Sequence, residues 1–247
     1  MSMKHESITR IAAGSRKAVL MIHGIAGSPG HFEPLLPAVP EDWSLYSILL
    51  DGHGGTVRDF SATSMKKWRS QVAQQVNDLL TQYDVLILAA HSMGTLFAIQ
   101  AAIDHPERIR GLLLLASPLR IHLPPATILG GLHLAIGKAQ RHKVAAAMEG
   151  DSSIRHEGKF FSYFGWTPRF AELLAEITRV RKLLSQLSVP CRIFQSRKDE
   201  LVSLRALRDI SRCEAMTLTV LENSGHFTYS ETDAGLLCDA LSQLLQS

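Results

Sequence analysis

Short, continuous apolar runs alternate along this chain with segments of helical periodicity, and this alternation constrains the fold more than any other feature. Continuous runs, unlike alternating ones, are typical of strands that are buried on both faces of a parallel sheet. A sheet whose strands alternate with amphipathic helices is doubly wound, with right-handed crossovers. The sequence therefore predicts an α/β fold with a mostly parallel sheet. The apolar runs are residues 18–22, 45–50, 85–90, 112–116, 191–195 and 218–221.

Two segments between or after these runs have the spacing of amphipathic helices, with apolar residues three or four positions apart. The first contains Met65, Trp68, Val72, Val76 and Leu79. The second, at the C-terminus, contains Leu237, Leu241, Leu244 and Leu245. One long stretch breaks the alternation, because residues 118–190 contain no strand-like run bounded by turns. This stretch is predicted to be a helical insertion.

The composition excludes several classes of protein. The net charge of +3 comes from 26 basic and 23 acidic residues spread along 247 residues, so no basic block indicates nucleic-acid binding. Three cysteines without CxxC spacing argue against a disulfide framework and a structural zinc site. The first residues do not resemble a secretory signal, and no apolar stretch approaches the roughly 20 residues that span a bilayer. We therefore expect a cytoplasmic protein without a nucleic-acid partner and without stable membrane insertion.

Ser92 stands in the segment Ala90-His91-Ser92-Met93-Gly94, between a predicted strand and a helix-compatible stretch. A serine in such an elbow projects its hydroxyl above the strand ends, and the N-terminus of the following helix favours developing negative charge. The turn is cramped, so small residues are needed two positions before and after the serine. Gly94 meets this need, whereas Ala90 departs from the usual G-x-S-x-G pattern by one methyl group. The context predicts Ser92 as a nucleophile.

A serine nucleophile needs a histidine base and an orienting carboxylate, in the chain order serine, acid, histidine on this fold. His226 follows the last predicted strand, and Asp199 follows the strand predicted at residues 191–195. Both lie at the carboxyl ends of strands, where the ligand sites of parallel sheets are found. Glu200 is the alternative acid because it adjoins Asp199. We prefer Asp199 since it comes first after the strand.

A glycine-rich turn, His23-Gly24-Ile25-Ala26-Gly27, follows the first predicted strand. A loop of this kind can aim a backbone N–H at an oxyanion. The predicted donors are the N–H groups of Ile25 and of Met93, the residue after the nucleophile. Because backbone atoms would act here, the side chains of Ile25 and Met93 are expected to line the acyl pocket.

No pattern in the sequence indicates a cofactor or a metal ion. The glycines lack the G-x-G-x-x-G spacing of a dinucleotide site and the G-K-[ST] of a phosphate-binding loop. Asp51 and His53 follow another predicted strand, but two ligands are too few for a metal site and no further ligand lies at a recognisable spacing. A turn stabilised by Asp51 is the preferred interpretation.

Taken together, these motifs resemble the α/β-hydrolase superfamily, and within it the small bacterial carboxylesterases and monoacylglycerol lipases. The resemblance extends over nearly the whole chain. It rests on H-G-x-x-G at 23–27, D-G-H-G at 51–54, H-S-M-G at 91–94, D-E at 199–200 and G-H at 225–226.

The resemblance implies a hydrolase core formed by residues 1–117 and 191–247, with a mainly helical cap at residues 118–190. It also implies a serine nucleophile, an acid, a histidine base and two backbone oxyanion donors. Position by position, these are Ser92, Asp199, His226, Ile25 and Met93.

The expected reaction is the hydrolysis of a small-molecule carboxylic ester through an acyl-enzyme on Ser92, with a short- to medium-chain acyl group or a monoacylglycerol as substrate. An acyltransferase and a carbon–carbon bond hydrolase would use the same triad. A non-catalytic ligand-binding protein on this scaffold is a third alternative. The sequence leaves the oligomeric state open.

Overall fold

The strands of the chain form one mixed sheet at the centre of the molecule. The computed structural model describes residues 5–122, 124–156, 158–211 and 213–246. Within these ranges the sheet has seven strands in the order β1-β3-β2-β4-β5-β6-β7. Every neighbouring pair is parallel except β1 with β3. The predicted doubly wound, mostly parallel α/β sheet is therefore confirmed.

Six of the strands correspond to the six apolar runs of the sequence, and the seventh, β1, was not predicted. β1 has only three residues, pairs antiparallel at the sheet edge and is largely exposed, so it carries no apolar run. The strands are β1 (Ile8–Arg10), β2 (Lys17–Ile22), β3 (Ser44–Ile48), β4 (Val85–His91), β5 (Ile109–Leu115), β6 (Cys191–Ser196) and β7 (Met216–Leu221).

Helices connect the strands, and none among the described residues is both long and apolar enough to cross a membrane. The α-helices are α1 (Val57–Ser61), α2 (Met65–Gln82), α3 (Met93–Asp104), α4 (Pro125–Ala135), α5 (Lys143–Asp151), α6 (Thr167–Arg181), α7 (Leu207–Ile210) and α8 (Glu231–Gln246). The 3₁₀ segments are η1 (Pro29–Ala38), η2 (Ala139–Arg141), η3 (Phe160–Trp166), η4 (Leu184–Gln186) and η5 (Leu204–Ala206).

Both faces of the sheet are buried, which explains the continuous apolar runs. Successive side chains of a strand point to opposite faces. In β2, Leu20 and Ile22 join the core cluster that also contains Trp68 of α2, whereas Val19 and Met21 join the cluster that includes residues of η1 and α8. A strand in this position needs an apolar residue at every step.

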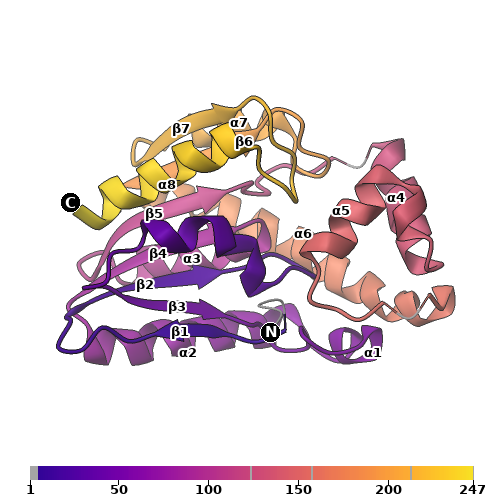
Figure 1. Cartoon of the computed structure of the whole chain (residues 1–247). Coiled ribbons are helices and arrows are strands. Elements are labelled where there is room, and N and C mark those ends of the chain that lie inside the picture. The colour runs from indigo at the N-terminus through magenta and orange to yellow at the C-terminus, as the bar shows by residue number, and fades with distance from the viewer. Residues whose placement is uncertain (1–4, 123, 157, 212, 247) are drawn as a thin grey trace.

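The chain between β5 and β6, residues 116–190, is called the β5–β6 segment below. Its described residues form helices and 3₁₀ turns but no named strand. α4 and α5 lie beyond the arrowheads of the parallel strands (Figure 1) and form a small apolar cluster of their own. α6 differs, because Leu173, Ile177 and Val180 belong to the main core cluster. The division into a core and a cap at residues 118–190 stays a prediction.

Candidate active site

The turn between β4 and α3 holds Ser92 in a left-handed backbone conformation, with φ of 50°. Such a conformation costs a non-glycine residue about 1–3 kcal/mol and persists where the surroundings enforce it. The N–H of Ser92 donates to the carbonyl of Leu115 on the neighbouring strand at 2.9 Å. A Cβ at Gly94 would overlap the carbonyl oxygen of Ile22, so only glycine lets α3 pass this close to β2. Strand, tight turn and helix follow one another here as expected.

The structure brings the three predicted catalytic side chains into one hydrogen-bonded line. Oγ of Ser92 lies 3.1 Å from Nε2 of His226. On the other side of the ring, Nδ1 of His226 lies 3.0 Å from each carboxylate oxygen of Asp199. All three residues are buried. Because Nδ1–H donates to the carboxylate, Nε2 is the nitrogen that accepts the proton of the Ser92 hydroxyl.

The two carboxylates that the sequence left as candidates do different things. Oδ1 of Asp199 accepts from the N–H groups of Leu201 and Val202 at 2.8 and 2.6 Å, which fixes the carboxylate against the imidazole. Oε2 of Glu200 accepts the backbone N–H of His226 at 2.6 Å. Asp199 thus faces the ring, and Glu200 holds the backbone that carries it.

The charges of His226 and Asp199 are mutually stabilising. Burial lowers the pKa of His226, but the charge of the Asp199 carboxylate and the hydrogen bond to it act the other way, and the pKa lies above its usual value. Burial raises the pKa of Asp199, but His226 and two backbone N–H groups bring it below its usual value. The imidazolium that forms when Ser92 loses its proton is therefore stabilised in place.

The loop after β2, residues 23–27, packs directly against Ser92 and is called the oxyanion loop below. A Cβ at Gly24 would lie 2.8 Å from Cβ of Ser92, so glycine is required for this approach. Ala26 is held at φ of 55°. The predicted donor Ile25 lies between these two residues. The other, Met93, is the first residue of α3, where an N–H has no acceptor within the helix.

His23 anchors the start of the oxyanion loop, a role that the sequence did not reveal. Its Nε2 accepts the N–H of Leu50 at 3.0 Å, so Nδ1 carries the proton that is donated to the carbonyl of Gly24 at 2.8 Å. Burial is the main cause that lowers the pKa of His23 to about 4. The ring therefore stays neutral, and both hydrogen bonds persist, at neutral pH.

A cavity of about 600 Å³ lies between the oxyanion loop and the β5–β6 segment. Its walls are mainly apolar and include Ile25 and Phe227, the neighbour of His226. Four apolar side chains of the lining are also exposed, so the opening of the cavity is largely apolar: Ile128, Leu132, Phe160 and Phe170.

The side chain of Met93 does not line this cavity, contrary to the expectation from the sequence. It is fully buried in the main core cluster. The first residue of α3 directs its side chain toward the core while its N–H stays at the helix N-terminus. Ile25 alone of the two predicted pocket residues contributes to the cavity wall.

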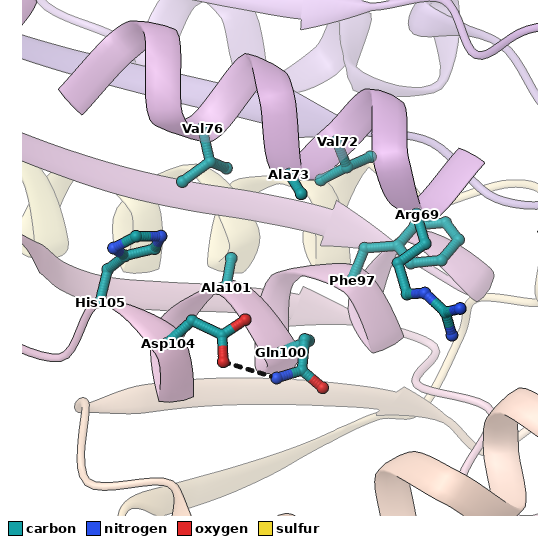
Figure 2. A pocket seen from close by; sticks show the side chains of 9 residues that line it. All are labelled: Arg69, Val72, Ala73, Val76, Phe97, Gln100, Ala101, Asp104 and His105. Atoms are coloured by element: carbon teal, nitrogen blue, oxygen red, sulfur yellow. Dashed lines mark hydrogen bonds between the residues drawn. The ribbon is translucent and has the colours of Figure 1, made fainter. Parts of the chain in front are cut away.

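A second cavity, of about 30 Å³, lies between α2 and α3 (Figure 2). Its walls include none of the predicted site residues, and its volume suits one or two water molecules rather than an ester. The lining residues are Arg69, Val72, Ala73, Val76, Phe97, Gln100, Ala101, Asp104 and His105.

Beside the triad, within the described residues, His31, His91 and Asp151 bring potential metal-ligand atoms within 4.8 Å of one another. The two imidazoles are stacked, with centroids 3.6 Å apart and planes inclined by 21°. Nitrogen lone pairs lie in the plane of each ring, so stacked rings do not point them at one ion. Nδ1 of His31 is instead 2.7 Å from Oδ1 of Asp151. The arrangement suits a hydrogen-bonded network better than a metal centre.

A mostly parallel sheet with a serine elbow after β4 and an acid and a histidine after β6 and β7 defines the α/β-hydrolase class. A family model described as serine aminopeptidase, S33 (Hydrolase_4), matches residues 13–233. The chain belongs to this family.

Partial matches connect the chain to curated bacterial proteins. It is 31% identical over 108 residues to a pimeloyl-[acyl-carrier protein] methyl ester esterase of Neisseria meningitidis, and the match spans 42% of this chain and 38% of the relative. It is 28% identical over 99 residues to a putative carbamate hydrolase of Caulobacter vibrioides, over 38% of this chain and 35% of that protein. The chain thus matches well under half the length of either relative.

Solved structures share the fold over nearly the whole chain. A structure reported for the metagenome-derived lipolytic enzymes LipS and LipT has a TM-score of 0.75 at 23% identity and covers 99% of this chain and 98% of its own. A soluble variant of the monoglyceride lipase of Saccharomyces cerevisiae has a TM-score of 0.70 at 15% identity, over 97% and 89%. At these identities the likeness establishes the architecture alone.

Proposed function

We propose that this protein is a serine hydrolase that cleaves carboxylic esters through an acyl-enzyme on Ser92. The observation that carries the proposal is the line of hydrogen bonds from Ser92 through His226 to Asp199, at 3.1 and 3.0 Å. A serine hydroxyl is a weak nucleophile at neutral pH unless a base removes its proton during attack. This line supplies such a base and orients it.

The reaction runs in two steps. His226 takes the proton of Ser92 as Oγ attacks the ester carbonyl, and the oxyanion accepts hydrogen bonds from the N–H groups of Ile25 and Met93. His226 then gives its proton to the leaving alcohol, and the acyl group stays on Ser92. In the second step His226 deprotonates a water molecule that attacks the acyl-enzyme. The bond between the acyl carbon and Oγ then breaks, His226 returns the proton to Ser92, and the carboxylic acid leaves. Asp199 holds the ring and stabilises its charged form in both steps.

The proposed substrates are esters with a short- to medium-chain acyl group, including monoacylglycerols. The support is the mainly apolar cavity of about 600 Å³ beside the triad, because an alkyl chain gains free energy when it leaves water for such walls. In this proposal residues 118–190 act as a cap over the site. The partial relative that is named as a methyl ester esterase adds support for ester chemistry.

A panel of p-nitrophenyl esters of increasing acyl length, assayed with the wild-type protein and with Ser92→Ala, tests the proposal. Turnover that requires Ser92 and varies with chain length supports it. Product analysis with added acceptor alcohols separates hydrolysis from acyl transfer, since transfer would yield a new ester. Slow turnover together with tight retention of a small ligand would instead indicate a binding protein and contradict the proposal.

The remaining expectations stay proposals of the same kind. We propose that the protein binds a small-molecule ester. We propose that it binds no nucleic acid and does not insert stably into a membrane. A cytoplasmic location also stays a prediction from the sequence, and fractionation of cells that express the chain tests it.

A further inference from the structure

Two loops carry the groups that act on the substrate in the proposed function. One is the oxyanion loop, residues 23–27. The other, residues 222–230 after β7, carries His226 and is called the histidine loop below. The last residue of α5 and the two residues after it, 151–153, are called the end of α5 below. They are hydrogen-bonded to the first loop directly and to the second through one side chain. This end of α5 therefore joins two loops that are far apart in the sequence.

The contact with the oxyanion loop is made by Ser153. Its side chain is fully buried, and Oγ donates to the carbonyl of Gly27 at 2.6 Å. Asp151 lies against the same residue, because a Cβ at Gly27 would be 3.5 Å from its Oδ2. Ala26, the preceding residue of the loop, has φ of 55°. A strained residue needs contacts around it to hold it, and the hydrogen bond of Ser153 fixes the residue that follows Ala26.

The connection to the histidine loop passes through His31 of η1. Nδ1–H of His31 donates to Oδ1 of Asp151 at 2.7 Å. Nε2 of His31 lies 2.9 Å from the hydroxyl of Tyr229, three residues after His226. Burial raises the pKa of Tyr229 well above its usual value, so the hydroxyl keeps its proton and remains a fixed hydrogen-bonding group rather than a nucleophile.

A third contact reaches the backbone of the catalytic histidine itself. The ring of His91 stacks on His31 with centroids 3.6 Å apart. Nε2 of His91 lies 3.1 Å from the carbonyl oxygen of His226 and donates to it. His31 thus touches α5, the histidine loop and the residue that supports the His226 backbone.

We propose that the end of α5 positions both loops for the reaction, with Asp151 and Ser153 as positioning residues. The inference rests on the proposed function. Its physical basis is that oxyanion donors and a general base must be held within a fraction of an ångström, and a misplacement of about 1 Å costs roughly 100-fold in rate. Asp151 and Ser152 also line the large cavity, so a substrate bound there contacts the segment that holds the reacting groups.

Two conservative variants test this role: Ser153→Ala removes the hydrogen bond to Gly27, and Asp151→Asn removes the charge that His31 faces. Each is assayed with p-nitrophenyl butyrate for kcat and KM, and with a trifluoromethyl ketone that forms a tetrahedral adduct on the serine. We expect kcat to fall by about 10- to 100-fold with KM within about twofold of wild type. The affinity for the ketone should fall by the same factor as kcat/KM.

Two matched controls separate positioning from general loss of structure. Glu149 lies on the same helix and bonds to Gln140 within the β5–β6 segment. Glu172 accepts the N–H of Met65 and so joins this segment to α2, away from both loops. Glu149→Gln and Glu172→Ala should keep kcat within about twofold of wild type, even where the midpoint of thermal unfolding falls.

Hydrogen exchange tests the positioning of the oxyanion loop independently of catalysis. The N–H of Gly27 donates to the carbonyl of Gly24 within the oxyanion loop at 3.1 Å. Ser153→Ala should speed hydrogen exchange at this amide by at least about tenfold, because the loop opens more often without its tether, and Glu172→Ala should not. If the wild-type protein hydrolyses no ester, the proposed function is wrong. The hydrogen-exchange comparison would still test whether Ser153 positions the oxyanion loop. A folded Ser153→Ala protein with wild-type kcat and wild-type exchange at Gly27 would overturn the proposed positioning. So would an equal loss of kcat in Glu172→Ala.

Discussion

Nδ1 of His226 lies 3.0 Å from both carboxylate oxygens of Asp199, so the carboxylate faces the ring nitrogen evenly. The two residues are contributed by the ends of β7 and β6, which pair in parallel and bring their following loops together. The relationship fixes which nitrogen of His226 is protonated. It also fixes the direction in which the pKa of the ring moves, and the first prediction follows from that direction.

The activity should rise with pH through the pKa of His226, because only the neutral ring accepts the proton of Ser92. That pKa lies above the usual value of about 6.5, so the acid limb of kcat/KM should lie above this pH. Asp199→Asn should move the limb to lower pH and lower kcat by about 10⁴. Lys198→Ala, a change at an exposed neighbour, should leave the limb in place. An unmoved limb in Asp199→Asn would show that another group controls the profile.

Gly24→Ala should disable the site while the fold survives. The added Cβ would lie 2.8 Å from Cβ of Ser92 and 3.3 Å from Nδ1 of His91, so the oxyanion loop must move away from the nucleophile. We expect kcat to fall by about 100-fold or more. Gly235→Ala in α8 is the control, since nothing lies within 4 Å of its Cβ; it should keep activity and gain up to about 1 kcal/mol of stability. Equal activities of the two variants would contradict this account of the loop.

Gly131→Leu should shorten the acyl chain that the protein accepts. Gly131 lines the large cavity, and a Cβ there has no neighbour within 4 Å. The new side chain should therefore fill cavity space without straining α4. We expect KM for long-chain esters to rise by about tenfold or more while butyrate esters are little affected. Gly150→Leu, also at an open position but outside the cavity wall, should leave the preference unchanged. The same shift in both variants, or none in Gly131→Leu, would place the acyl group elsewhere.

The positions of six strands and of the elbow followed from the sequence because each depends on local pattern. Strands buried on both faces must be apolar throughout, and the six runs became β2 to β7. Ser92, Asp199 and His226 were found because each follows such a run, and parallel strands end at the same edge of the sheet. β1 was not predicted, because its three largely exposed residues at the sheet edge carry no such pattern.

The contacts that escaped prediction depend on the tertiary fold. His31, Asp151 and Tyr229 come from three distant segments, and no spacing in the sequence indicates that they form one hydrogen-bonded line. The direction of the Met93 side chain was misjudged for a related reason, since the start of α3 sets it and the motif does not. In the sequence, His31 and Asp151 are only one histidine and one acid among many, and nothing next to them indicates a contact.

The identity of the nucleophile is tested most directly by labelling with a fluorophosphonate probe followed by mass spectrometry of the peptides. We predict one modified peptide, with the adduct on Ser92, and no labelling in Ser92→Ala. Ser47→Ala is the matched control, because Ser47 is also a buried serine, and its hydroxyl has no hydrogen-bond partner within the described residues; it should label like wild type. Labelling that persists in Ser92→Ala, or an adduct on a different residue of the wild-type protein, would contradict the account.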